Sequence, residues 1–281
     1  MRTATIDGRM VIITDGRAID VATASDGAFG PDALDVLERW GEFRAWAVGA
    51  TLGEGQPFAV EQLGAPVPNP RQVFAIGLNY RAHAEESNIS APTLPAVFTK
   101  FPASIAGPVS TVCLPPGGHV DWEVELVVVI GKRARFVTGD EVWEHVAGLS
   151  VGQDLSERIR QLDGAAPQFS MGKSYEGFAP FGPYLTTPDE LADPEDLELS
   201  CTLDGEVMQR SRTSNMIHDV RALVVHLSAI LPLLPGDLIF TGTPSGVGVA
   251  RKPQRFIQPG EVLVSTIEGL GDIRQDFVAA R

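Results

Sequence analysis

Short apolar runs separated by clusters of glycine, proline and asparagine make up most of this chain. Runs of this kind, rich in β-branched and aromatic residues, are typical of strands. They lie at 73–76, 97–99, 120–130 and 238–241. A further run at 197–203 alternates apolar and polar residues up to Asp204-Gly205, which predicts a hairpin. The chain is therefore expected to be mainly β-sheet.

Helical spacing is found in only two segments. Pro31 opens a short pattern in which Leu34, Leu37 and Trp40 share one side. The longer pattern should begin at Ser214, which we expect to cap it. Its apolar positions are Met216, Ile217, Val220, Leu223, Val224 and Leu227. Pro235-Gly236-Asp237 then predicts a turn into the strand at 238–241.

Two domains are predicted. Residues 1–65 form a small N-terminal domain that begins with a hairpin at Ile6-Asp7-Gly8-Arg9, a two-residue turn sequence. Three prolines between residues 64 and 70 favour an extended connection. The second domain then occupies residues 70–281, and the candidate chemistry lies within it.

Composition narrows the classes of partner. With 44% hydrophobic and 21% charged residues the chain is typical of globular proteins. The formal net charge is −14, and no run of Lys or Arg interrupts it, so nucleic acid is not expected as a partner. A field this negative also repels anionic substrates. An acidic substrate would therefore need a local positive centre, such as a metal ion.

The two cysteines, Cys113 and Cys201, are too few for a disulfide framework. The first ten residues contain no signal-like apolar stretch, and the most apolar segment, 222–234, is shorter than a membrane span. A cytoplasmic protein without a membrane partner is therefore expected.

Three carboxylates lie within six residues at D-W-E-V-E-L, 121–126. Side chains alternate along a strand, so Asp121, Glu123 and Glu125 should point one way, and Trp122 should lie on the opposite, buried face. Like charges on one face repel one another unless a cation neutralises them. The alternative interpretation is an acidic strand that faces solvent.

Asp154 follows a second apolar run and could supply a third oxygen ligand to a cation. A ligand set of carboxylates without His or Cys favours a hard cation such as Mg²⁺ or Mn²⁺ and does not indicate zinc.

A second candidate is His83 with Glu86, three residues further on. On a helix the two side chains would face each other, and the carboxylate would fix the tautomer of the imidazole as a general base. A surface ion pair is the alternative.

Taken together, these motifs resemble the fumarylacetoacetate hydrolase family. The resemblance covers residue 71 to the C-terminus. It rests on G-L-N-Y-x-x-H-x-x-E at 77–86, F-T-K at 98–100, W-E-V-E-L at 122–126, D-L-S-E-R-x-x-Q at 154–161, G-K-S-Y-E-G-F-A-P-F-G-P at 172–183, Q-R-S-R-T-S-N-M-I at 209–217, P-G-D-L-I-F-T-G-T-P-S-G-V-G at 235–248 and I-E-G-L-G at 267–271. Gln153, Glu157 and Ile159 depart from the family's usual Asn, Ala and Asp.

The resemblance implies an α+β fold, predominantly β, in which a mixed β-roll surrounds the metal site and a small N-terminal domain is appended. It also implies a homodimer. The implied residues are Glu123, Glu125 and Asp154 as ligands of Mg²⁺ or Mn²⁺, His83, Glu86 and Lys173 as catalytic groups, and Tyr80, Lys100, Arg158, Gln161 and Thr243 as substrate-binding groups. Asp121 would then lie outside the ligand set. The hydroxyl of Thr243 is expected to receive a substrate carboxylate.

The implied reaction is hydrolysis of a C–C bond in an acylpyruvate, a small 2,4-dioxo acid of the kind met in aromatic catabolism, to pyruvate and a carboxylic acid. In this interpretation His83 activates water and Lys173 stabilises the oxyanion. The alternatives within the family are an oxaloacetate decarboxylase and an isomerase or hydratase of 2-hydroxy-diene-dioates. The alternative to an enzyme is a metal-binding protein without catalytic activity. The polar segment from Asn79 to Pro92 is expected to act as a lid.

Overall fold

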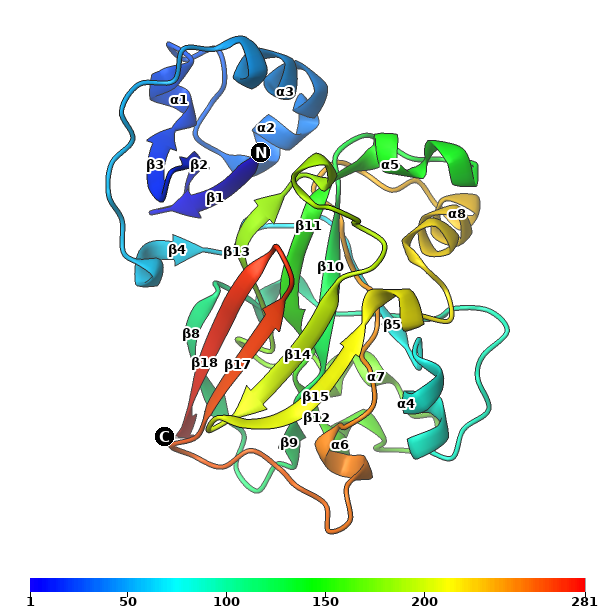
Figure 1. The fold of residues 1–281 in the computed structure, drawn as a ribbon. Helices are drawn as coiled ribbons and strands as arrows, with labels where there is room; N and C mark the ends of the chain where they lie inside the picture. The colour runs from blue at the N-terminus through cyan, green and yellow to red at the C-terminus, as the bar shows by residue number, and fades with distance from the viewer. Residues whose placement is uncertain (281) are drawn as a thin grey trace.

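Two packed β-sheets form the frame of the computed structural model, which describes residues 1–280 (Figure 1). The large sheet runs in the order β3 (Arg17–Asp20), β2 (Arg9–Thr14), β1 (Arg2–Ile6), β13 (Ala179–Thr186), β11 (Val146–Gln153), β10 (Val124–Ile130), β16 (Leu238–Phe240), β5 (Val73–Gly77) and β6 (Ala96–Thr99), with β4 (Leu63–Gly64) on β1 and β7 (Ile105–Ala106) on β13. The smaller sheet runs β15 (Glu206–Arg212), β14 (Glu198–Leu203), β17 (Val262–Ile267), β18 (Gly271–Ala279) and β8 (Val109–Leu114). A two-stranded ladder joins β12 (Ser156–Glu157) to β9 (Val120–Asp121).

Short helices connect these strands. They are α1 (Val21–Ala24), α2 (Ala33–Glu38), α3 (Trp40–Gly49), α4 (Arg81–Glu86), α5 (Val142–His145), α6 (Arg158–Gln161), α7 (Phe169–Gly172) and α8 (Val220–Ile230). The expected mixed fold dominated by strands is thus confirmed. No helix within residues 1–280 has the length and apolar character that crossing a membrane would require.

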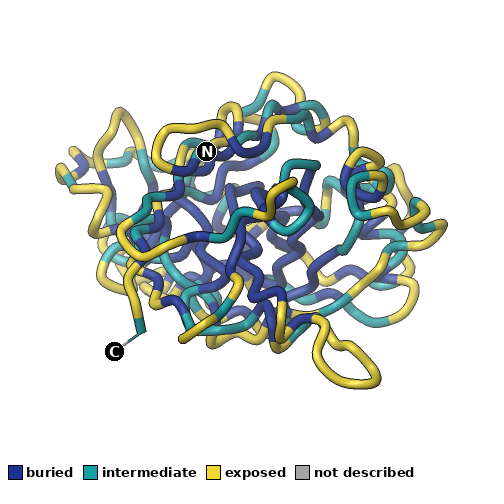
Figure 2. Tube along the Cα trace, turned by 90° about the horizontal axis from the view of Figure 1, so that it is seen from below, coloured by how far each residue is buried: buried dark blue, intermediate teal, exposed yellow. Residues whose placement is uncertain are grey.

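Strand β10 lies at the centre of the large sheet and is buried on both faces. Its even-numbered residues, from Val124 to Ile130, pack into the core shared with the smaller sheet and α8. Val127 and Val129 pack on the opposite face, against the core that contains α2 and α3. Burial on both faces explains the unbroken apolar run in this part of the sequence. Figure 2 shows the buried trace gathered at the centre of the molecule, with exposed loops around it.

The N-terminal segment joins the same sheet, because β1 pairs antiparallel with β13. Phe43 and Trp40 of the helical part lie in one apolar cluster with Val127 and Phe240 of the large domain. The proposed division at residues 65–70 therefore separates segments that share a sheet and a core. Whether the two parts fold as separate units stays a prediction.

Both predicted hairpin turns are confirmed. The residue pairs Asp7-Gly8 and Asp204-Gly205 connect β1 to β2 and β14 to β15, and all four residues have positive φ. Paired positive φ values match the twist of two-residue hairpins, and glycine adopts them without steric cost.

Two predicted boundaries are wrong. The strand expected over 120–130 is broken at Trp122–Glu123, between β9 and β10. The helix expected from Ser214 begins at Val220 instead, because Asp219 provides the cap by accepting from the backbone N–H of Ala222 at 2.8 Å. Ser214 lies before the helix and donates to Asp196 at 2.6 Å.

The buried Asp237, in the turn before β16, predicts a pH-dependent stability. Its Oδ2 accepts from Gln72 and from the backbone N–H of Leu234, whereas Oδ1 is buried without a partner in the described chain. Burial raises the pKa of Asp237 to about 6. The folded state therefore keeps a proton that the unfolded state releases, so stability falls as pH rises to about 6.

We expect Asp237→Asn, which stays uncharged, to be about 1–2 kcal/mol more stable than the natural chain at pH 8, with no such gain at pH 4. Urea unfolding at the two pH values measures this difference. The exposed Asp272→Asn serves as the control and should show no such pH dependence. An equal effect of Asp237→Asn on stability at both pH values would contradict a raised pKa of Asp237 in the folded state.

Candidate active site

Three buried carboxylates meet where β10 and β11 run side by side. The backbone N–H of Asp154 donates to the carbonyl of Glu123 at 2.9 Å, which places the residue after β11 opposite the residue before β10. One ligand oxygen from each of Glu123, Glu125 and Asp154 lies within 4.8 Å of the others. All three residues are at most 5% exposed. The alternative of a solvent-facing acidic strand is therefore wrong.

Glu125 is the carboxylate that most needs a cation. Its Oε2 accepts from the backbone N–H of Gly242 at 2.8 Å, but no Lys, Arg or His within residues 1–280 forms an ion pair with it. Burial, together with the nearby Asp154 and Glu123, raises its pKa well above the usual range. Because the donors are all carboxylate oxygens, the three side chains fit a hard divalent cation such as Mg²⁺ or Mn²⁺.

Two buried lysines reach into the same cluster. Lys173 Nζ donates to Glu123 at 2.8 Å, to Asp154 at 2.8 Å and to the hydroxyl of Ser156 at 2.7 Å. Lys100 Nζ lies 2.6 Å from Asp154 and also donates to the carbonyl of Lys173. All three protons of the Lys173 ammonium are thus used within the cluster. It provides fixed positive charge and would have to release a partner before it could donate to a substrate oxyanion.

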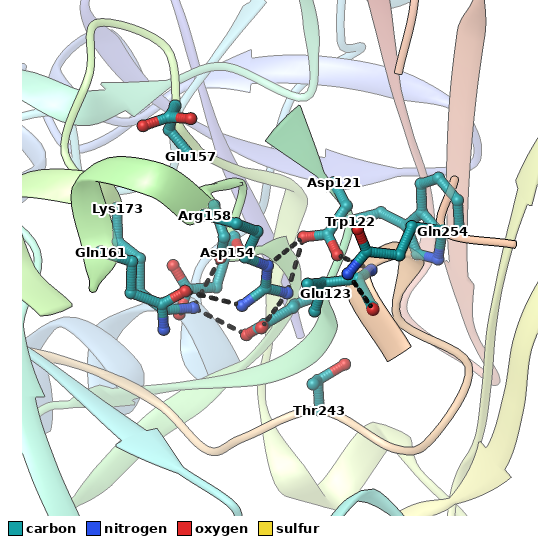
Figure 3. A network of polar contacts seen from close by, with 12 residues as sticks. Asp121, Trp122, Glu123, Asp154, Glu157, Arg158, Gln161, Lys173, Thr243 and Gln254 are labelled. Atoms are coloured by element: carbon teal, nitrogen blue, oxygen red, sulfur yellow. Dashed lines mark hydrogen bonds and ion pairs between the residues drawn. The ribbon is translucent and has the colours of Figure 1, made fainter. Parts of the chain in front are cut away.

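Arg158 forms the outer side of the cluster, between Asp121 and Glu123 (Figure 3). Its guanidinium donates to Asp121 at 2.6 Å, to Glu123 at 2.7 Å and to Gln161 at 2.9 Å. Asp121 also accepts from the backbone N–H of Val249 at 2.7 Å. The structure therefore places Asp121 in an ion pair beside the three metal-fitting carboxylates.

Two of the three departures from the family pattern, Glu157 and Gln153, have structural roles that the sequence did not reveal. Glu157 caps α6 by accepting from the backbone N–H groups of Ile159 and Arg160, which fixes the turn that carries Arg158. Gln153 accepts from the N–H of Glu123 at 2.8 Å. The side chain of Ile159 is exposed.

His83 and Glu86 face each other on one side of α4. The Nδ1 atom of His83 lies 2.7 Å from Glu86 Oε1, and Glu86 Oε2 accepts from the backbone N–H of Gly246 at 2.9 Å. His83 is only 7% exposed, so the alternative of a surface ion pair is wrong. Since the loop at Gly246 holds Glu86, the carboxylate is fixed before it orients the imidazole.

The His83–Glu86 pair and Glu123, one of the three clustered carboxylates, line one cavity of about 450 Å³. Of the predicted residues, those that line it are His83, Glu86, Glu123, Arg158, Gln161, Lys173 and Thr243. Tyr80, Lys100, Glu125 and Asp154 do not line it. Tyr80 belongs to the apolar core, Lys100 is bound to Asp154, and Glu125 and Asp154 are buried beneath the wall that Glu123 and Lys173 form.

Thr243 lines the cavity, but its hydroxyl is already bound. The hydroxyl donates to the carbonyl of Val124 at 2.9 Å and accepts from Gln209 at 2.8 Å. A substrate carboxylate could therefore take that proton only by displacing a backbone contact. Gln209 is a supporting residue that sequence reasoning missed, because its partners lie on distant strands.

Asn79, the first residue of the predicted lid, is fully buried and fixed. Its side chain donates to the carbonyls of His218 and Thr241 and accepts from the N–H of His218. Any movement of the segment up to Pro92 must therefore begin after this residue. The lid itself stays a prediction.

A family profile, fumarylacetoacetate (FAA) hydrolase C-terminal, matches residues 72–278. The chain belongs to the fumarylacetoacetate hydrolase family. The match begins at β5 and includes every residue of the cluster and the cavity described above.

Two curated relatives are enzymes of this family. The mitochondrial oxaloacetate tautomerase FAHD2A of Bos taurus is 44% identical over 210 residues, which cover 74% of this chain and 67% of the relative. The 2,4-didehydro-3-deoxy-L-rhamnonate hydrolase of Sphingomonas sp. (strain SKA58) is 45% identical over 226 residues, covering 80% and 78% of the two chains.

Solved structures agree in fold over the whole chain. A Mycobacterium smegmatis protein with the provisional description HpcE has a TM-score of 0.96 and 52% identity, with 100% of both chains covered. The maleylpyruvate hydrolase of Sphingobium sp. SYK-6, solved with manganese (II) ion and pyruvate, has a TM-score of 0.79 and 28% identity, also with 100% of both chains covered. Members of the fumarylacetoacetate hydrolase family thus include hydrolases and tautomerases.

Because Glu125 has no ion-pair partner within residues 1–280, its charge should lower the stability of the metal-free protein and should be needed for the stabilisation by metal. We expect Glu125→Gln to leave the metal-free melting temperature unchanged or higher, because it removes a buried like charge. The same change should abolish the stabilisation by Mn²⁺, which for the natural chain is about 2.7 kcal/mol at a hundredfold excess over Kd. Thermal unfolding with Mn²⁺ or with EDTA measures both effects.

Asp121→Asn is the matched control, since Asp121 is equally buried but pairs with Arg158. It should lower the metal-free stability by about 1–3 kcal/mol and retain the Mn²⁺ effect. A full Mn²⁺ effect in Glu125→Gln would show that Glu125 is not a ligand.

Proposed function

We propose that this protein is a divalent-metal-dependent hydrolase that cleaves a C–C bond in 2,4-dioxo acids of the acylpyruvate type. The products would be pyruvate and a carboxylic acid. The observation that carries this proposal is that a fixed His83–Glu86 pair lines the same cavity as Glu123, one of the three metal-fitting carboxylates. A protein that only bound metal would have no physical need for an oriented base beside it.

The charges of the cluster fit an acidic substrate. Four carboxylates (Asp121, Glu123, Glu125 and Asp154) lie against three cations (Lys100, Lys173 and Arg158), which leaves one negative charge in excess. A divalent cation would convert this into a net positive charge, and a 2-oxo acid would then neutralise it. The site could thus attract an anion into a protein whose net charge is −14.

Glu123, Glu125 and Asp154 would hold the metal, which when bound supplies a Lewis acid for the oxygens of a 2-oxo acid. His83 would take a proton from the water that attacks the distal carbonyl, and Glu86 would stabilise the imidazolium that forms. Gln161 and Arg158, which line the cavity beside Glu123, would orient the substrate. His83 would return the proton to the carbon released as the methyl group of pyruvate.

Two relatives support this reaction class. The name 2,4-didehydro-3-deoxy-L-rhamnonate denotes an acid with oxo groups at C2 and C4, and its hydrolase is 45% identical to this chain. Maleylpyruvate is itself an acylpyruvate, and its hydrolase was solved with manganese and pyruvate.

Oxaloacetate chemistry is the second candidate, as a tautomerase or a decarboxylase. The similarity to the oxaloacetate tautomerase of Bos taurus favours it. Neither reaction requires activated water, so the His83–Glu86 pair would serve only to move a proton.

Substrate turnover and pyruvate formation together distinguish these reactions. We would follow the ultraviolet absorbance of the enol and, in a coupled lactate dehydrogenase assay, pyruvate, with Mn²⁺, Mg²⁺ or EDTA. Metal-dependent pyruvate release from an acylpyruvate is expected. Loss of the oxaloacetate enol without pyruvate would indicate a tautomerase, and pyruvate from oxaloacetate alone would indicate a decarboxylase. No turnover of either substrate would overturn the proposal.

Replacement of the base should affect hydrolysis selectively. We expect His83→Ala to lower kcat for an acylpyruvate by about 10²–10⁴-fold, because a positioned base contributes this much. Binding of Mn²⁺, measured by thermal shift, should be unchanged. His226→Ala, on the remote helix α8, is the control and should retain activity. Unchanged hydrolysis in His83→Ala would show that another group activates the water.

A further inference from the structure

The cavity wall carries seven charged or titratable residues, and five of them are already paired. Glu123 is bound by Lys173 and Arg158, and Glu86 is bound by His83. The two others are Arg251 and Lys252, on the loop after the glycine-rich turn. Within residues 1–280 neither forms an ion pair with a carboxylate. The unbalanced charge on this wall is therefore positive, although the protein as a whole is strongly acidic.

Backbone contacts fix this loop relative to the base. Gly246 donates its N–H to Glu86, and its carbonyl accepts from Nε of Arg251 at 3.3 Å. Arg251 also donates through Nη2 to the carbonyl of Met208 at 2.9 Å, and its guanidinium lies 5.6 Å from the ring centre of Trp122. Arg251 is thus held in place, whereas the exposed side chain of Lys252 is free to meet a ligand at the rim.

Two parts of the cavity wall offer charged groups to a substrate. The carboxylate cluster binds the 2-oxo acid end in the proposed function, and the His83–Glu86 pair lies beside the carbonyl that water attacks. The loop with Arg251 and Lys252 is a separate part of the wall, linked to Glu86 through Gly246 and to Asp121 through the N–H of Val249. Its two cations are the charged groups of the wall that have no acidic partner within residues 1–280, so a second carboxylate of the substrate could bind there. The group that follows the cleaved bond should therefore extend toward these two cations.

We propose that Lys252, supported by Arg251, forms a subsite for a second carboxylate at the far end of the substrate. The preferred substrates would then be 2-oxo dioic acids rather than 2-oxo acids with an apolar tail. The inference rests on the proposed function for the placement of the 2-oxo end. The competing occupant is an apolar tail against Ile89, Leu162 and Phe169, which also line the cavity.

A matched pair of ligands tests the subsite without turnover. The acids 2-oxoadipate and 2-oxohexanoate have the same chain length and differ only in a terminal carboxylate or methyl group. Titration calorimetry of the Mn²⁺-loaded protein should give about three- to tenfold tighter binding of 2-oxoadipate, the range expected for a partly exposed charged contact. Equal binding, or tighter binding of 2-oxohexanoate, would overturn the proposal in favour of an apolar tail.

Substitutions of Lys252 test whether this residue causes the preference for 2-oxoadipate. Lys252→Gln should remove most of this preference, and Lys252→Glu should reverse it, while the affinity for 2-oxohexanoate stays the same. Lys132→Gln is the control, because Lys132 is also exposed and lies outside the cavity. A preference that survives in Lys252→Glu would refute the role of Lys252.

The result is separable from the proposed hydrolysis. If 2-oxoadipate binds through Lys252 but no acylpyruvate is cleaved, the proposed reaction is wrong and the subsite stands. If acylpyruvates are cleaved and the two ligands bind equally, the reaction stands and the subsite is wrong.

Discussion

The repulsion among Glu123, Glu125 and Asp154 is the constraint on which the rest of the site depends. Three carboxylates at most 5% exposed cannot all keep their charge in a low-dielectric interior without cations. Lys100, Lys173 and Arg158 supply three of those charges, each from a different part of the chain. Arg158 also pairs with a fourth buried carboxylate, Asp121, so the carboxylates exceed the cations by one. Glu125 is the carboxylate without an ion pair within residues 1–280, so the fold itself creates the need for a further cation.

Rigid sheet geometry holds these charges at short distances. β10 and β11 pair along their whole length, and each is covered on both faces by apolar residues. The site lies where this covered pair ends, so the carboxylates cannot relax toward solvent. Supporting contacts from Gln153, Glu157 and Gln209 fix the backbone and the side chains around them. Because these groups are already held in place, little energy would be needed to rearrange them during a reaction.

The same cluster also explains how one framework can serve several reactions. In the proposed function the carboxylate cluster would bind the part of the substrate that oxo acids share, whereas the base and the loop at 246–254 would meet the part that differs. A change in the loop could therefore alter the substrate without disturbing the cluster. The named relatives include both a hydrolase and a tautomerase, which agrees with this division.

The sequence by itself determined the features that depend only on residues close together in the chain. The hairpins at Asp7-Gly8 and Asp204-Gly205 follow from positive φ, and the face shared by Glu123 and Glu125 follows from alternation along a strand. His83 and Glu86 meet because they lie three residues apart on a helix. Asp154 was inferred from the apolar run that it follows, and motif resemblance added Lys173 and the family itself.

Only the tertiary structure decided what depends on distant partners. It moved the start of α8 from Ser214 to Asp219, because Ser214 is bound to Asp196. It bound the hydroxyl of Thr243 to Val124 and placed Lys100 behind Asp154, out of the cavity. It also left Arg251 and Lys252 without acidic partners among the described residues, and no spacing in the sequence indicates this. Which charges are paired depends on residues far apart in the chain, and only the folded structure brings those residues together.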